Sequence, residues 1–247
     1  MLSDYDYRRN RLLAYLPDEE AARILYDSSV VPLAQGQILY QPGLPLEYAY
    51  FPIDAIISLL SVTEDGSSAE TAIIGNEGVL GTCIVMGENT TTCATVQRAG
   101  KAYKIRSGIL KREFERGATF QQLLLFYTQV LITQMTQTAL CNRYHLIDQQ
   151  LCRWLLLNLD RMSGNELVAT QELISNELGV RREGVTEAAK RLQETGLIQY
   201  SRGHITVRDR LGLEARACEC YHVVKAELDR LFPDNLFKTA GTTRIVC

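Results

Sequence analysis

Short apolar segments separated by turn signals occupy residues 30–106. Segments 53–62 and 70–74 are mostly apolar or alternate between apolar and polar positions, which is typical of strands that bury one or both faces. Clusters of Gly, Pro, Asn and Asp interrupt them about every 10–12 residues, where a chain reverses direction. The pattern predicts a small antiparallel β-barrel, roll or sandwich, preceded by a short helix that begins near Pro17.

A helical period replaces this pattern after Thr119. Neither Gly nor Pro occurs from Thr119 to about Arg143, and apolar residues recur at steps of three and four. One narrow line predicts a seam for a partner helix, and its members are Leu124, Tyr127, Leu131, Met135 and Thr138. A second apolar face allows the helix to pack on its own β domain as well, and its members are Leu123, Phe126, Val130 and Ile132.

The segment 170–208 predicts two helices joined by a tight turn and followed by a hairpin. Thr170 caps the first helix, Gly179 breaks the chain, and the second helix begins near Arg181. The small side chain of Ser175 lets the two helices cross closely, and apolar residues on both helices fill the corner between them. Because the signal for a β-hairpin follows directly, the complete pattern indicates a winged helix.

Charge divides the chain, although the total is only −3. No Lys or Arg occurs among residues 24–97, which carry eight acidic side chains. From Arg98 onward, 22 basic residues outnumber 16 acidic ones, so this part carries a net +6. A polyanion would be repelled by the first part and attracted by the second, which favours nucleic-acid binding by the C-terminal part.

The second helix of the pair has one polar face over its N-terminal half. Side chains there can reach base edges in a major groove, and basic residues beyond it suit phosphates. The alternative is a solvated face on a helix pair that docks on protein. The predicted DNA-binding residues are Gln171, Arg181, Arg182, Glu183, Thr186, Glu187, Lys190, Arg202 and His204, with Arg191, Arg208 and Arg210 as further phosphate contacts.

This order of elements resembles the Crp/Fnr superfamily, the relatives of the cyclic-AMP receptor protein, over about residues 8–210. The best-matched motifs are 36–43 (GQILYQPG), 154–159 (WLLLNL) and 178–185 (LGVRREGV), and the start of a strand at 51–55 (FPIDA) is similar to one branch of the family. The resemblance implies an α+β fold with an N-terminal antiparallel β-roll, a long dimerisation helix and a C-terminal winged helix-turn-helix.

The resemblance also implies a division of labour along the chain. Residues 1–118 would form the sensor domain, residues 119–147 the dimerisation helix, and residues 148–247 the DNA-binding domain with a helical extension. A member of this family would be a homodimeric transcription regulator that binds a palindrome in double-stranded DNA and contacts RNA polymerase.

The cyclic-nucleotide site of the family is degenerate in this chain. Val79 stands where the family has a Glu for the ribose, no Arg among residues 24–97 can pair with the phosphate, and the helix Arg of the family falls on Ile132. Because burying a phosphate without a cation is costly, we expect no cyclic-AMP binding. The roll could instead bind a neutral or cationic effector, or no ligand at all. The candidate residues that would line an effector pocket are Gly78, Val79, Leu80, Thr91, Thr92, Met135 and Thr136.

The seven cysteines and three histidines predict no cofactor, no metal and no catalytic site. Cys218, Cys220 and His222 have a metal-like spacing, but we expect them within one helix over 211–231, where positions two apart point about 200° apart. Structural thiols are therefore expected, with redox sensing through Cys141 or Cys152 as an alternative. His145 is expected to hold no haem or metal.

No apolar run is long enough to span a membrane, and the first residues lack an apolar signal core. The odd cysteine count in a chain of 247 residues favours reduced thiols. We therefore expect a cytoplasmic protein that is not an enzyme.

Overall fold

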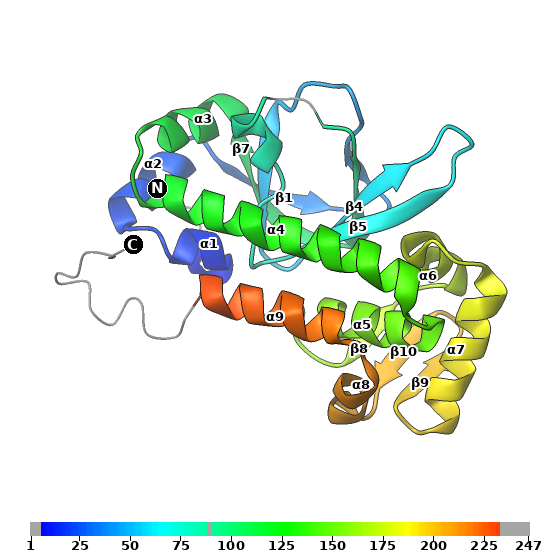
Figure 1. Cartoon of the computed structure of the whole chain (residues 1–247). Helices are drawn as coiled ribbons and strands as arrows, with labels where there is room; N and C mark the ends of the chain where they lie inside the picture. Colours follow the sequence, from blue (N-terminus) through cyan, green and yellow to red (C-terminus); the bar gives the residue numbers. More distant parts are fainter. Residues whose placement is uncertain (1–5, 88–89, 233–247) are drawn as a thin grey trace.

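The computed structural model describes residues 6–87 and 90–232. A short helical segment, a β-roll, one long helix and a C-terminal winged helix follow one another along the chain (Figure 1). This arrangement confirms the α+β fold class predicted from the sequence. No helix in these two ranges is long and apolar enough to cross a bilayer. The N-terminal helical segment comprises η1 (Tyr7–Arg9), α1 (Arg11–Ala14) and α2 (Asp18–Leu25).

The β-roll consists of two antiparallel sheets in the strand orders β1-β7-β3 and β2-β6-β4-β5. Their inner faces bury apolar side chains such as Phe51, Ile57 and Ile73, which explains the apolar runs in the sequence. A single helical turn, η2 (Thr82–Val85), follows the second sheet's edge strand. The strands are β1 (Ser29–Leu33), β2 (Ile38–Tyr40), β3 (Tyr48–Pro52), β4 (Ile56–Val62), β5 (Ser68–Ile74), β6 (Cys93–Arg98) and β7 (Gly100–Arg106).

Helix α3 (Ser107–Glu115) leads from the roll into the long helix α4 (Thr119–Tyr144). The seam that the sequence predicted for a partner helix is wrong, because Leu124, Tyr127 and Leu131 are at most 4% exposed inside the protomer. Of its other members, Thr138 is also buried and Met135 is half-buried against the core. The helix turns a different line outward, in which Leu125, Phe126, Ile132 and Leu140 are exposed.

The C-terminal domain begins with α5 (Ile147–Leu159), followed by the helix pair α6 (Gln171–Leu178) and α7 (Arg182–Glu194). The predicted hairpin is β9 (Ile198–Ser201) with β10 (His204–Val207). A third strand, β8 (Glu166–Val168), pairs with the other edge of β10, where the sequence indicated only a domain boundary.

The predicted helix over 211–231 is wrong as a single element, because it consists of α8 (Arg210–Arg216) and α9 (Glu219–Leu231). Ala217 and Cys218 lie between them in extended conformation. Helix α9 runs alongside α4 (Figure 1) and buries Tyr221, Val224 and Leu228. The long helix is therefore covered by the roll on one side and by α9 on another. The rest of the predicted extension, residues 233–247, lies outside the described residues.

Candidate nucleic-acid interface

The helix pair α6–α7 is held by local interactions that the sequence specifies. The side chain of Thr170 accepts a hydrogen bond from the backbone of Leu173 at 3.1 Å and caps α6. Gly179 ends α6 in the left-handed conformation with φ +65°, which a residue with a side chain rarely adopts. Helix α7 then packs through a wholly buried apolar face, which consists of Val185, Ala188, Ala189 and Leu192.

The opposite face of α7 is exposed over its N-terminal half, as the sequence predicted. Gln171 at the start of α6 accepts a hydrogen bond from Thr186 on α7 at 2.8 Å, so the two predicted contact residues lie side by side. The side chains of Arg181 and Arg182 form no hydrogen bond or ion pair within the described part of the chain. They are available to a ligand outside the protomer. The exposed residues of this face are Arg181, Arg182, Glu183, Thr186, Glu187 and Lys190.

Two arginines proposed as phosphate contacts are engaged by protein carboxylates instead. Arg191 donates to Asp148 of α5 at 2.6–3.1 Å, and this pair holds the pKa of Asp148 below its ordinary value. Arg210 donates to Asp160 and, at 2.9 Å, to Glu214. Both side chains therefore tie elements of the C-terminal domain to the two ends of α5, which the sequence could not indicate because Asp148 and Asp160 are distant from them along the chain.

The wing presents its basic residues at the tip of the β9–β10 hairpin. Arg202 has φ +49° and Gly203 φ +82°, the pair of positive values that a tight two-residue hairpin turn requires. A positive φ is strained for a residue with a side chain, so the turn fixes Arg202 at the tip. Both Arg202 and His204 are exposed, which agrees with the prediction that they can reach a phosphate backbone.

A buried carboxyl pair joins this domain to the roll. Ser58 Oγ of β4 lies 2.6 Å from Glu70 Oε2 of β5 and 3.2 Å from Glu177 Oε1 of α6. A hydroxyl has one proton, so both hydrogen bonds form together only if one carboxyl is protonated. Gln97 and Trp154 donate to Glu177 Oε2 at 2.6 and 2.7 Å, which favours the charge on Glu177. Glu70 therefore holds the proton.

The buried carboxyl pair should make stability depend on pH. Burial raises the pKa of Glu70 well above its usual range, with repulsion from Glu177 adding to it, while Arg153 and Arg161 oppose the shift. Burial also raises the pKa of Glu177 to about 7. The folded state thus binds a proton that the unfolded chain releases above about pH 4.5, so stability should fall by on the order of 2 kcal/mol between about pH 5 and pH 8.

Glu70→Gln tests this dependence, because a glutamine amide can donate to Ser58 as the protonated acid does. Urea unfolding at several pH values should show a flatter profile for Glu70→Gln than for the wild type. Glu64→Gln, at an exposed position of the neighbouring turn, is the control and should keep the wild-type slope. Equal slopes for Glu70→Gln and the wild type would show that Glu70 holds no proton in the folded state.

The residues predicted to line an effector pocket do not share one surface. Gly78, Val79 and Leu80 are buried, whereas Thr91 and Thr136 are exposed. The ring of Tyr127 fills the space beside Gly78, where an added Cβ would lie 1.9 Å from the Tyr127 oxygen. Of the remaining two, Thr92 is half-buried and donates its backbone N–H to Thr90, and Met135 packs against the core.

An arginine does reach the loop that precedes Gly78, but it comes from the C-terminal domain. Arg161 Nε lies 2.8 Å from Glu77 Oε1, and the two side chains are 2% and 5% exposed. The family pattern predicts a cation only within the roll or on the long helix. Arg161 lies outside both and is 84 positions from Glu77, so the sequence does not indicate this pair. Since the Glu77 carboxylate compensates the Arg161 charge, this cation is not available to neutralise a phosphate.

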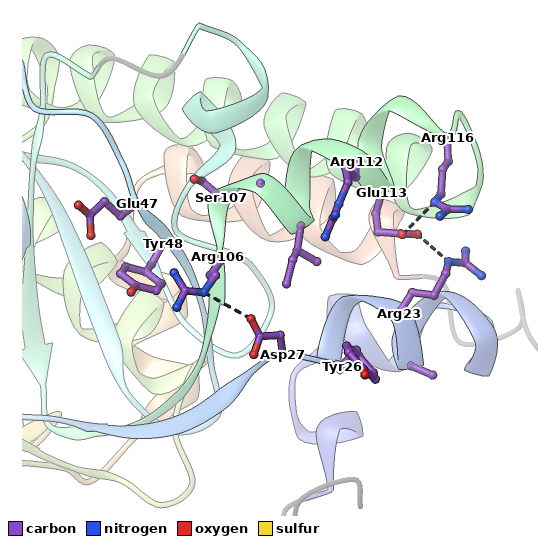
Figure 2. Close-up of a pocket in the computed structure, with 13 residues that line it drawn as sticks. Arg23, Tyr26, Asp27, Glu47, Tyr48, Arg106, Ser107, Arg112, Glu113 and Arg116 are labelled. Carbon is purple, nitrogen blue, oxygen red and sulfur yellow. Dashed lines mark hydrogen bonds and ion pairs between the residues drawn. The ribbon is translucent and has the colours of Figure 1, made fainter.

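An open cleft lies between α2, α3 and the end of β7 (Figure 2). Arg23 and Arg116 each lie 2.9 Å from the carboxylate of Glu113, and Arg106 lies 3.4 Å from Asp27. The cleft is lined by four arginines and three carboxylates, so most of its positive charge is neutralised. None of its lining residues belongs to the predicted effector set.

A helix pair with an exposed polar N-terminus, followed by a basic wing, has the architecture of a winged-helix DNA-binding domain. Residues 149–216 match the sequence profile of the Crp-like helix-turn-helix domain. This part of the chain is therefore a Crp-like helix-turn-helix domain, as the sequence resemblance predicted. No curated protein sequence is significantly similar to the chain.

Solved structures of Crp/Fnr-type regulators share the fold of this chain. FixK2 from Bradyrhizobium japonicum superposes with a TM-score of 0.66 at 16% identity, over 77% of this chain and 98% of that one. A regulator assigned to the Crp/Fnr family from Eubacterium rectale superposes with a TM-score of 0.63 at 18% identity, over 85% of this chain and 98% of that one. The c-di-GMP-responsive global regulator CLP from Xanthomonas campestris gives 0.61 at 15% identity, over 78% and 100%. At these identities the likeness establishes the fold.

Proposed function

We propose that this protein binds a palindromic operator as a homodimer, with α7 in the major groove, and regulates transcription without cyclic AMP as its effector. The roll (1–118), the long helix (119–147) and the C-terminal part (148–247) would serve sensing, dimerisation and DNA binding. RNA polymerase is the expected protein partner, as the family resemblance implies.

The unengaged side chains of Arg181 and Arg182 on the exposed end of α7 carry this proposal. An arginine guanidinium can bind the O6 and N7 atoms of a guanine through two hydrogen bonds, which fixes one base pair of the site. Glu187 lies further along the same face and cannot pair with guanine, but it can accept from a cytosine amino group. Its contact with Arg191 at 3.7 Å leaves it mostly exposed.

Replacing Arg182 by alanine is expected to weaken binding to the preferred site by about 1–3 kcal/mol and to relax specificity at one base pair. Fluorescence anisotropy with fragments of the upstream region of its own gene measures both effects. Lys190→Ala is the matched comparison, because Lys190 is exposed beyond the base-reading end and pairs only weakly with Glu194 at 3.8 Å. Lys190→Ala should weaken binding to all DNA sequences by the same factor. It should also reduce the slope of log affinity against log salt concentration by about one. If neither variant changes DNA affinity, α7 does not bind DNA.

The outward line of α4 supports the homodimer. Leu125 and Ile132 are seven residues apart, so they face the same side of the helix and are 55% and 51% exposed. Phe126 and Leu140 extend the same apolar surface. A stripe of exposed apolar side chains on a long helix is typical of an interface between helices, and it replaces the buried seam as the proposed contact.

Two further features of the roll argue against cyclic AMP. The Tyr127 ring packs against Gly78, and the Arg161 side chain that reaches the preceding loop is paired with Glu77. A phosphate placed there would have no cation to compensate its burial. The alternative of a thiol-based redox sensor at Cys152 is disfavoured, because burial raises the pKa of that thiol to about 12 and suppresses its reactive thiolate.

A further inference from the structure

Three buried cysteines and a histidine converge where α4 ends and α9 begins. Cys141 lies in the last turn of α4, and His145 follows as its C-terminal cap. Cys218 is the residue before α9, and Cys220 lies in its first turn. The four candidate ligand atoms all lie within 4.8 Å of one another. Cys141 Sγ is 3.5 Å from Cys218 Sγ, and Cys220 Sγ is 3.6 Å from His145 Nδ1.

We propose that Cys141, His145, Cys218 and Cys220 bind one Zn²⁺ ion in a closed tetrahedral site. Zinc–sulfur bonds of about 2.3 Å and a zinc–nitrogen bond of about 2.05 Å place tetrahedral ligands about 3.8 Å apart for two sulfurs and about 3.6 Å for sulfur and nitrogen. The Cys141–Cys218 and Cys220–His145 separations of 3.5 and 3.6 Å are close to these values, and all four atoms lie within 4.8 Å of one another. Three thiolates with one imidazole are a donor set that zinc prefers in structural sites.

The geometry disfavours the other uses of such a cluster. The sulfurs of Cys141 and Cys218 are too far apart for a disulfide, whose bond length is about 2.05 Å, and all three cysteines of the cluster are free. The ligands of an iron–sulfur cluster surround several metal atoms and must stand further apart than those of a single ion. The surrounding apolar packing leaves Cys141, Cys218 and Cys220 at most 2% exposed, so the site would be closed to water.

The spacing of Cys218 and Cys220 is unfavourable for a metal only within one continuous helix. Cys218 instead precedes α9 with ψ 164°, so its side chain is not bound by the helical angle that separates positions two apart. His222, the third member of the sequence triplet, is exposed and lies outside the cluster. The other two ligands, Cys141 and His145, come from the end of α4, four positions apart on one face of the helix.

Groups around the cluster are arranged as an outer layer of a metal site. The Nε2 atom of His145 lies 3.4 Å from Glu219 Oε2, while its Nδ1 faces Cys220. A carboxylate on the far nitrogen fixes the tautomer that leaves Nδ1 free to bind a metal. Gln150 donates to the backbone carbonyls of His145 at 2.9 Å and Cys141 at 3.4 Å, which fixes the end of α4.

A buried cation balances the charge of the proposed centre. Zinc with three thiolates and a neutral imidazole carries a net charge of −1. Arg153 is 6% exposed, donates to Thr138 one turn before Cys141, and acts electrostatically on Cys141 and Cys220. Its Nε has no hydrogen-bond partner within the described residues. A buried guanidinium with spare hydrogen-bonding capacity is stabilised by such an anionic centre.

The ion would join the two ends of the C-terminal domain to the long helix. His145 stands at the α4–α5 junction, and α9 is the last element of the domain. A zinc ion that links the end of α4 to the start of α9 would fix the orientation of α7 relative to α4. This consequence rests on the proposed function, whereas zinc binding itself does not.

Metal content and cobalt substitution of the full-length protein test the site. Protein purified under reducing conditions should contain one zinc ion per chain, measured by inductively coupled plasma mass spectrometry. After removal of the metal and addition of Co²⁺, it should show the visible bands of tetrahedral cobalt and ultraviolet thiolate-to-metal charge transfer. Cys220→Ser and His145→Ala should lose tight binding of Zn²⁺ in a chelator competition. His222→Ala and Cys83→Ser are the matched controls and should retain it.

Glu219→Gln covers the case in which a ligand variant fails to fold, because Glu219 is largely exposed and is not itself a ligand. It should weaken zinc affinity by about 10–100-fold while the circular dichroism spectrum is unchanged. Absence of both zinc and cobalt bands in the wild type would overturn the proposal, as would a Cys141–Cys218 disulfide found by alkylation. Loss of metal in His222→Ala but not in His145→Ala would overturn this set of ligands.

DNA binding separates the two proposals. Removal of zinc from the wild type should lower operator affinity, and restoring zinc should recover it. A zinc-loaded protein that binds no DNA would contradict the proposed function and leave the metal site standing. Equal operator affinity with and without zinc would overturn the orienting role alone.

Discussion

Replacing Arg161 by methionine is expected to lower the free energy of unfolding by roughly 3–5 kcal/mol. The variant leaves the Glu77 carboxylate buried without its counter-charge. Arg161 also donates to the carbonyl of Leu157 at 2.7 Å, and its stem packs against Gly75, where an added Cβ would lie 2.8 Å from Arg161 Cγ. The ion pair therefore ties the end of α5 to the loop that precedes Gly78.

Urea denaturation measures this effect, and two variants calibrate it. The double variant Glu77→Gln, Arg161→Met removes both charges and should recover part of the stability lost in the single variant. Arg230→Met breaks an exposed pair with Glu227 and should change stability little. If Arg161→Met is no more destabilising than Arg230→Met, the buried pair does not hold the two domains together.

If the protein is the homodimer proposed above, replacing Ile132 by aspartate is expected to convert it into a folded monomer. Ile132 is half-exposed in the middle of the outward line of α4, so the protomer tolerates a charge there, whereas a symmetric interface would bury two of them. Light scattering should report the mass of a single chain. Because one half-site supplies too few contacts, operator affinity should fall by about a thousandfold or more, toward that for non-specific DNA.

Two variants separate the loss of this interface from unfolding of the protomer and from a general effect of added charge. Val223→Asp places the same charge at an exposed apolar position of α9 and should remain dimeric. Leu131→Asp, one residue away, should unfold the protomer, because Leu131 is 4% exposed within it. A dimer of Ile132→Asp with normal mass would show that the outward line of α4 is not the interface.

The sequence determined most of the elements and their order, although not strand β8 or the break between α8 and α9. Turn signals and apolar runs indicated the strands of the roll, and the gap in Gly and Pro indicated α4. Thr170, Ser175 and Gly179 indicated the helix pair, because capping, close crossing and positive φ each demand a particular residue type at a particular position. These are local requirements, so a single sequence can express them. The exposed face of α7 followed for the same reason, since its packing face is marked by a helical period.

Only the tertiary structure decided which surfaces meet. The period of α4 supplied two apolar lines, and no local signal indicated that α9 and the roll would cover the line through Leu131. Arg161 contacts Glu77, Glu70 lies beside Glu177, and Cys141 contacts Cys218. The members of each pair are far apart in the chain, so no local pattern indicates the partner. Cys218 can share a metal ion with Cys220 because α9 begins at Glu219, and a residue before a helix is not held to the backbone angles within it. Long-range proximity is a property of the packed chain, and the charge pairs and the cluster of thiols depend on it.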